Sequence, residues 1–349
     1  MAKKIQVSDD AGTNWYTLPG STGTMDLNGD EIDDTILGQT FKSSEAGLIN
    51  WDIVGEALYK GFAGYQAKLK QQGTSTTMTT ESMSLVSGKT YSIDAASKEI
   101  WDRSATLTVF DNAVDHTADV IDINYLYGQV TFASSYTVTG PITVSGKYFP
   151  TVTFANAQSF TLTQTMNPID NTTFAKAQTN GGFKEFEAGL RTVQLSLSGV
   201  FDASTGMTAV LTGRGEVVIE IDPAGDGTSI ARGFFRILKK GQQGDVGALE
   251  EESVTASLNV PADDLISKVF AWRHGATTTI PTALKKILTA WEDETSLTAR
   301  YMPTGVVGAS PKDAIEGTIW LSDVSLSSGL SAMNKFNASL QGSGAVTEV

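Results

Sequence analysis

One stretch of this sequence occurs twice. Residues 32–51 read IDDTILGQTFKSSEAGLINW, and residues 169–193 read IDNTTFAKAQTNGGFKEFEAGLRTV. Ile32 and Asp33 match Ile169 and Asp170 at an offset of 137 residues, whereas the EAGL quartets at 45–48 and 187–190 match at an offset of 142. The second copy therefore carries five additional residues between its two matched ends. An internal repeat of this kind predicts a duplicated architecture.

The segments around the repeat extend the correspondence. The stretches INWDIVGEAL and RTVQLSLSGVF follow the two copies, and the second alternates apolar and polar residues as a half-buried strand does. Residues 104–110 correspond in residue type to residues 295–301, and residues 127–146 correspond to residues 316–329. These segments follow the repeat in the same order in both halves of the chain. We therefore expect two tandem domains, residues 1–152 and 153–349, with a boundary uncertain by about ten residues.

The composition favours β-structure. Of the 349 residues, 18% are charged and 40% hydrophobic, and Thr, Ser and Gly are abundant. Short alternating runs such as SFTLTQT, EVVIEID and SVTASLNV are bounded by turn residues. Two segments near 262–292 predict helices: Leu265, Val269 and Trp272 share one helical face, and so do Leu284, Leu288 and Trp291. The expected fold class is mainly β with flanking helices (α+β), and the first half offers no comparable helix.

Charge and chemistry exclude several classes of function. The formal net charge of −14 disfavours binding to DNA or anionic membranes, and no apolar run approaches the ~18 residues that span a bilayer. The start of the chain predicts no signal peptide. Cysteine is absent, which removes thiolate nucleophiles and Cys-based zinc sites. His116 and His274 have no partners at metal-site spacing, and no phosphate-binding loop is present. The sequence thus supports neither an enzyme nor a cofactor.

Two short motifs have structural and functional interpretations. SDDAGTNW at 8–15 fits the Asp-box pattern, which stabilises hairpin turns, and turn chemistry explains Asp10, Gly12 and Trp15. DLNGDEIDD at 26–34 resembles a calcium loop but lacks the Gly and Glu of an EF-hand. A solvated turn is favoured there, and a looser calcium site made of Asp26, Asn28 and Asp30 stays open.

Several segments resemble the tail tube proteins, also called major tail proteins, of bacteriophages with long, non-contractile tails. These segments are KKIQVSDDAGTNWYTLPG, ATLTVFDNAV and DINYLYGQVTF, together with the β-domain and its flanking helices. The duplicated chain resembles the tube subunits of those siphophages in which one subunit contains two tube domains, in particular the Chi-like, flagellum-attaching group. The resemblance covers nearly the whole chain.

The resemblance implies an assembly rather than an active site. It implies tandem β-sandwich or barrel domains, and homotrimer rings with pseudo-sixfold symmetry stacked into a tube in the virion tail, assembled in the cytoplasm of the bacterial host. The implied partners are further copies of the chain, the tape measure, tail tip and tail terminator proteins, and genomic DNA in transit without specific binding; no membrane is implied.

In such proteins a loop between early strands contacts the neighbouring ring. The repeat lies where that loop would fall, so we predict inter-ring contacts from both copies. The candidate residues are Thr35, Phe41, Lys42, Gly47, Thr172, Phe183, Lys184 and Gly189, and the repeat-equivalent structural positions are Ile32, Asp33, Leu48, Ile169, Asp170 and Leu190.

An alternative interpretation is a carbohydrate-binding β-sandwich of a virion or secreted surface protein. It rests on the Asp-box and on the aromatic residues Trp15, Trp51 and Trp101. A tube subunit is expected to form rings without any ligand, whereas a carbohydrate-binding module is expected to stay discrete and respond to sugars.

Overall fold

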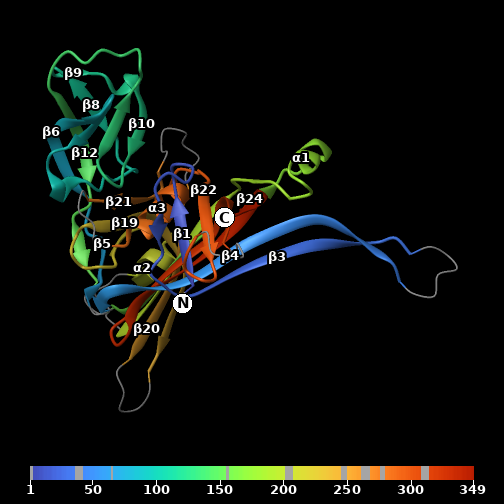
Figure 1. Ribbon diagram of the computed structural model, residues 1–349. Coiled ribbons are helices and arrows are strands. Elements are labelled where there is room, and N and C mark those ends of the chain that lie inside the picture. Colours follow the sequence, from blue (N-terminus) through green and yellow to red (C-terminus); the bar gives the residue numbers. More distant parts are fainter. Residues whose placement is uncertain are drawn as a thin grey trace. The chain divides into compact units, whose positions relative to one another are not determined.

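Strands dominate the fold, and the helices are few and short, as the composition predicts (Figure 1). The structure is a computed structural model that describes residues 3–35, 42–63, 66–154, 157–200, 207–244, 250–260, 268–275, 280–307 and 314–349. The predicted fold class, mainly β with a few helices, is confirmed. None of the described helices is both long and apolar enough to span a membrane.

The chain forms two compact units, each assembled from segments far apart in the sequence. The first unit comprises Met1–Gln66, Gln158–Ser196 and His274–Val349, and the second comprises Ala67–Ala157 and Leu197–Arg273. Both units take residues from both sides of the predicted boundary at 152. The division into two tandem tail-tube-like domains stays a prediction.

The first unit is built on a hairpin of two long strands, β3 and β4. Beyond β4 the hydrogen-bonded order continues through β24, β23, β22, β1 and β2, and β14 pairs with the second half of β23. The strands are β1 (Lys4–Ser8), β2 (Tyr16–Thr17), β3 (Gly20–Asp33), β4 (Ser44–Ala63), β14 (Ala157–Met166), β15 (Ile169–Asp170), β16 (Phe186–Glu187), β17 (Arg191–Val200), β22 (Leu297–Met302), β23 (Ile315–Gly329) and β24 (Met333–Glu348). The helices are α1 (Phe174–Thr179) and α3 (Thr282–Glu292).

Helix α3 confirms one of the two predicted helices. Leu284, Leu288 and Trp291 are buried together with Ile287, as their helical spacing requires. Arg191 donates to the backbone carbonyls of Trp291 and Glu292 at 3.1 and 2.6 Å, which satisfies acceptors at the helix C-terminus. The amphipathic pattern therefore identified this element correctly.

The other predicted helix is wrong where the structure describes it. Residues Phe270–His274 form strand β21, and Phe270 and Trp272 meet edge to face with ring centroids 6.4 Å apart. Three consecutive buried residues, 270–272, are typical of a strand covered on both faces, and an apolar run this short does not distinguish strand from helix. Leu265 lies outside the described residues.

The second unit contains a seven-stranded sheet in the order β10-β11-β7-β6-β12-β8-β9 and a further group in the order β13-β5-β18-β19-β20, with β21 beside β19. The strands are β5 (Lys68–Gln72), β6 (Thr76–Ser87), β7 (Thr90–Ile93), β8 (Thr108–Asp111), β9 (Val114–Asp115), β10 (Val120–Asn124), β11 (Gln129–Phe132), β12 (Ile142–Tyr148), β13 (Thr151–Thr153), β18 (Val217–Asp222), β19 (Ser229–Gln243) and β20 (Glu251–Leu258). Helix α2 (Met207–Thr212) and two short 3-10 turns, η2 (Ala96–Lys98) and η3 (Thr117–Asp119), complete it.

A buried ionic network lies within the second unit. The Arg232 guanidinium contacts Glu220 at 2.7 Å and Glu99 at 2.8 Å, and all three side chains are nearly inaccessible to solvent. Lys70 adds a second cation 2.7 Å from Glu220. Burial disfavours the charged form of Glu220, but the attraction of Arg232 and the hydrogen bonds from Lys70 and Arg232 outweigh that effect and lower its pKa.

The two units repeat one sequence of elements. In the first unit α3 precedes β22, β23 and β24, and β22 pairs with β1; in the second unit α2 precedes β18, β19 and β20, and β18 pairs with β5. A β-bulge interrupts both hairpins at corresponding positions, after Ile237 and after Leu321. The extra residues, Leu238 and Ser322, are 84 positions apart. Because bulges are built features of strand pairs, the shared position indicates a common plan.

This plan corrects two predicted correspondences. Residues 104–110 and 127–146 were expected to match 295–301 and 316–329, but residues 108–111, 129–132 and 142–148 form β8, β11 and β12 of the seven-stranded sheet. The strand that corresponds to β22 by pairing and order is β18. The match in residue type was therefore a coincidence of two β-rich segments.

Candidate functional site

The duplicated sequence forms two arms in the first unit. The first arm comprises residues 30–49, of which 36–41 lie outside the described residues, and it is the end of the β3–β4 hairpin. The second arm comprises residues 167–190, between β14 and β17, and carries β15, α1 and β16. Figure 1 shows β3 and β4 extending well beyond the other strands of the first unit.

A threonine closes the base of the first arm. The Asp33 carboxylate accepts the N–H of Thr35 at 3.0 Å, and the Thr35 hydroxyl accepts the N–H of Ser43 at 2.9 Å and donates to its carbonyl at 3.2 Å. Asp34 donates its N–H to the same carbonyl at 3.2 Å. Hydrogen bonds from Thr35 hold the pKa of Asp33 below its usual range. The strands are thus joined across the arm by side chain and backbone together.

The second arm repeats this arrangement bond for bond. The Asp170 carboxylate accepts the N–H of Thr172 at 2.9 Å, and the Thr172 hydroxyl accepts the N–H of Glu185 at 2.9 Å and donates to its carbonyl at 3.4 Å. Asn171 donates its N–H to the Glu185 carbonyl at 3.1 Å. Hydrogen bonds from Thr172 lower the pKa of Asp170. We call this arrangement the Asp-x-Thr clamp.

The glycines of the repeated EAGL quartets also occupy equivalent places. A Cβ on Gly47 would lie 3.2 Å from Cγ1 of Ile32, and a Cβ on Gly189 would lie 3.3 Å from Cγ1 of Ile169. The Gly47 position also meets the carbonyl of Asp30 at 3.1 Å, and a Cβ on Gly189 would overlap the carbonyl of Asn167. Gly189 therefore has no room for a side chain, and a side chain at Gly47 would be tightly packed against the facing strand.

The two arms contact each other within one chain. Ile49 donates its N–H to the Gly182 carbonyl at 2.8 Å and accepts the N–H of Lys184 at 2.8 Å. The Lys184 ammonium lies 2.9 Å from the Asp30 carboxylate. Phe183 forms an isolated bridge with Ile49. Two predicted inter-ring residues, Phe183 and Lys184, therefore have partners in the first arm.

Apolar side chains of the arms are left in solvent. Ile32 and Ile169, which are equivalent in the repeat, are 54% and 57% exposed, and Leu190 and Phe174 are 83% and 92% exposed. Leu48, the counterpart of Leu190, is half-buried, and Lys42 contacts Glu31 at 3.3 Å. Phe41 lies outside the described residues. Exposed apolar groups on a projecting element are typical of an interaction surface. No pattern in the sequence indicates that Phe174 is exposed.

The Asp-box is a hairpin turn between β1 and β2, as predicted. Asp10 accepts the N–H of Asn14 at 2.8 Å and the hydroxyl of Ser8 at 2.7 Å, and these bonds, with a second one from Asn14, lower the pKa of Asp10 to about 2. The Arg300 guanidinium lies 3.9 Å from the centroid of the Trp15 ring. Trp51 and Trp101 are fully buried, so they do not form the aromatic surface that the carbohydrate interpretation required.

The predicted metal and histidine sites are ordinary structural positions. Asp26, Asn28 and Asp30 lie on strand β3, not on a turn. Across the described part of the chain, no group of three or more Asp, Glu or His side chains is arranged to hold a metal ion. His116 contacts Asp119 at 2.9 Å, and His274 ends a strand rather than a helix. Burial lowers the pKa of His274 to about 4.

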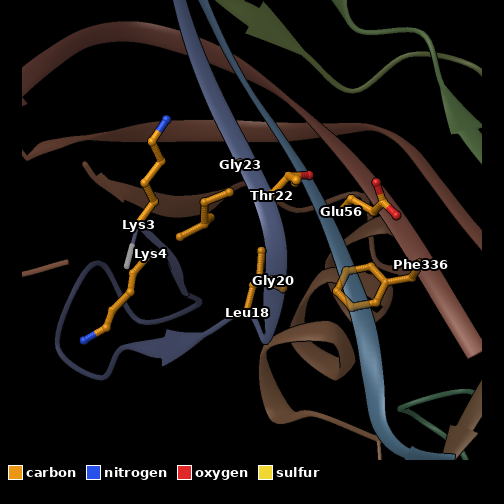
Figure 2. A pocket seen from close by; sticks show the side chains of 10 residues that line it. Lys3, Lys4, Leu18, Gly20, Thr22, Gly23, Glu56 and Phe336 are labelled. Atoms are coloured by element: carbon orange, nitrogen blue, oxygen red, sulfur yellow. The ribbon is translucent and has the colours of Figure 1, made fainter. Parts of the chain in front are cut away.

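A small cavity lies at the start of β3 in the first unit (Figure 2). Its volume is about 230 Å³, and Ile5, Leu18 and Phe336 supply apolar lining. Figure 2 shows the side chains of Lys3 and Lys4 pointing in different directions. The cavity is smaller than the 300 to 1,000 Å³ of typical ligand sites.

Comparisons with known proteins give limited matches. No protein-family model matches the sequence, and no curated protein matches it. One similar solved structure is the tail of an empty gene transfer agent particle with C6 symmetry, with 16% identity, a TM-score of 0.30 and coverage of 36% of this chain and 87% of that chain. Another is the virion of a native gene transfer agent particle, with 18% identity, a TM-score of 0.29 and coverage of 36% and 89%. TM-scores below 0.5 do not establish a common fold.

Proposed function

We propose that this protein is a structural subunit that associates with copies of itself into rings, which stack into the hollow tail tube of a bacteriophage with a long, non-contractile tail. The tube is the conduit through which the genome leaves the particle. The proposal places the protein in the virion tail after assembly in the host cytoplasm, with tape measure, tip and terminator proteins as partners.

The observation that carries the proposal is the pair of arms closed by the same Asp-x-Thr clamp. A clamp that fixes the base of each arm lowers the entropy lost when the arm docks on another surface. Exposed Ile32, Ile169 and Leu190 lose solvent contact only if something covers them. In a polymer of identical subunits, the same apolar residues must be covered on every subunit. This repeated requirement explains why the same arm occurs twice in one chain.

Two further features support the proposal. The repeated element order and the shared bulge position in the two units suit a trimer ring that imitates sixfold symmetry. The net charge of −14 suits a conduit that must not retain DNA phosphates.

Electron microscopy of the purified protein tests the proposal. We expect hollow rings or tubes with threefold or sixfold symmetry in end-on class averages. Featureless monomers at high concentration, also in the presence of a tail-tip initiator complex, would contradict the self-assembly. A glycan array would then test the carbohydrate alternative.

A matched pair of variants tests the role of the arms. In I32S/I169S/L190S the exposed apolar residues of the arms become polar; in L85S/V86S/I121S three residues of similar exposure change on the seven-stranded sheet of the second unit. We expect the first variant to shorten or abolish tubes and the second to assemble normally. Deletion of residues 36–44 is expected to act like the first variant. Tubes of normal length and stability in both arm variants would remove the arms from the contact.

A further inference from the structure

The second half of β19 has a strand partner on one side only. Residues 239–243 pair with Glu251–Thr255 of β20, whereas the pairing with β18 reaches no further than Phe235 and leaves the other edge uncovered among the described residues. A run of unpaired backbone N–H and C=O groups at a sheet edge is a template for another strand.

The second half of β23 corresponds to the second half of β19 and shows which kind of strand would pair with the open edge of β19. Residues 323–327 pair with β24 on one side, as β19 pairs with β20, and with Thr161–Thr165 of β14 on the other. The common bulge aligns Asp323 with Lys239, because both directly follow the extra residue. The strand missing beside β19 is therefore the counterpart of β14.

That counterpart is β3. The offset of 137 residues that relates Ile32 to Ile169 also aligns β3 with β14. The structure supports this alignment, because Gly47 approaches Ile32 as Gly189 approaches Ile169. Strand β3 pairs with β4 and with no other described strand. Its residue Leu27 shares a face with buried Trp51 yet is 48% exposed, whereas the equivalent Gln164 on β14 is fully buried. Leu27 thus lacks the neighbour that β23 gives to β14.

We propose that residues 24–28 of β3 pair antiparallel with residues 239–243 of β19 in a second copy of this chain, with Asn28 opposite Lys239 and Asp26 opposite Gly241. This proposal rests on the proposed self-assembly and names the strands and the register through which it occurs. The contact is heterologous: each copy offers one β3 edge and one β19 edge, so each copy has two neighbours.

Charge favours the same pairing. Asp26 lies directly opposite Asp52 across the β3–β4 hairpin, and like charges in such a pair repel each other. Lys239 is exposed, and its partner in the β19–β20 pair is the uncharged Thr255. In the proposed pair Lys239 would lie beside Asn28, on the face of β3 that carries Asp26. A lysine there compensates a repulsion that one chain alone leaves in place.

Disulfide cross-linking tests the register, because the chain has no cysteine of its own. In N28C/K239C the two thiols face each other across the proposed pair, and oxidation is expected to give covalent dimers and larger species on a non-reducing gel. In the control N28C/Q242C the second position is shifted by three residues, about 10 Å, and points to the other face, so no comparable ladder is expected.

The outcomes separate this inference from the proposed function. If the unsubstituted protein forms rings or tubes but N28C/K239C cross-links no better than the control, or only within one chain, the register is wrong and the self-assembly stands. If the unsubstituted protein stays monomeric and N28C/K239C gives no ladder, both fail.

A charge swap tests the same contact without cysteines. K239E is expected to raise the dissociation constant for self-association about fivefold at low salt, and D26K/K239E to return it to within about twofold of the original value. K147E makes the same charge change on β12 and is expected to leave association unchanged. Equal effects of K239E and K147E, or no recovery in the swap, would overturn the proposal.

Discussion

Thr35 and Thr172 hold the same position in two copies of one hydrogen-bonded clamp: each hydroxyl accepts a backbone N–H at 2.9 Å from the opposite side of its arm. The two residues are 137 positions apart, and the residues that donate these N–H groups, Ser43 and Glu185, are 142 apart. The same bond therefore closes both arms, although the second arm is five residues longer between the bonded positions.

Removing both hydroxyls is expected to loosen the arms. In T35A/T172A the N–H groups of Ser43 and Glu185 lose their partners, which is expected to cost about 0.5 to 1.5 kcal/mol per clamp. Hydrogen exchange at these two amides is expected to accelerate, and tube formation to weaken. The conservative variant T35S/T172S keeps both hydroxyls and is expected to match the original protein; loss of protection in the serine variant as well would refute the role of the hydroxyl.

A methyl group at Gly189 is expected to distort the second arm. The Cβ of G189A would overlap the Asn167 carbonyl, so the strands must separate, with an expected cost of about 1 to 3 kcal/mol. Chemical denaturation followed by tryptophan fluorescence measures the change. Gly29 is the matched control because nothing lies within 4 Å of its Cβ position, and G29A is expected to change stability by less than about 0.5 kcal/mol. Equal effects at the two glycines would contradict the close approach.

Arg232 is expected to be essential to the second unit. R232M leaves Glu220 and Glu99 buried without their main cation, which is expected to cost about 3 to 5 kcal/mol. K42M, which removes the exposed pair of Lys42 with Glu31, is expected to cost less than about 1 kcal/mol. Urea titration of both variants provides the comparison, and a cost for R232M as small as that for K42M would show that the network is dispensable.

The Asp26–Asp52 pair is expected to make stability depend on pH. Desolvation first, and then the charge of Asp26, raise the pKa of Asp52 in the folded protein. Because this carboxyl pKa is raised, ionisation of Asp52 lowers the free energy of unfolding at pH values above the folded-state pKa. It has no such effect below the unfolded value of 3.8. D52N is therefore expected to stabilise the unassembled protein at pH 7 by about 0.2 to 1 kcal/mol and to lose this advantage as the pH falls below 3.8.

Thermal unfolding of D52N and of the original protein between pH 3 and pH 7 measures this dependence. The exposed residue Asp94 supplies the control substitution, D94N, which is expected to show no such profile. An advantage of D52N that persists unchanged at pH 3 would mean that it does not arise from charge.

The sequence by itself determined the local features of this protein. Turn chemistry gave the Asp-box hairpin at Asp10, the heptad-like spacing of Leu284, Leu288 and Trp291 gave α3, and the doubled IDxT and EAGL segments gave two equivalent arms. These features are readable because they depend on neighbours within a few residues or on a motif spelled twice.

Only the tertiary structure decided which distant strands pair. Strand β24 joins β4, β14 joins β23, and the second arm rests on Ile49. These contacts depend on packing between segments more than a hundred residues apart, which no local pattern encodes. The same packing made residues 270–274 a strand beside β19 instead of a helix, because burial on both faces overrides a weak helical pattern. It also left β3 and β19 each with an open edge, the feature from which the contact between copies is inferred.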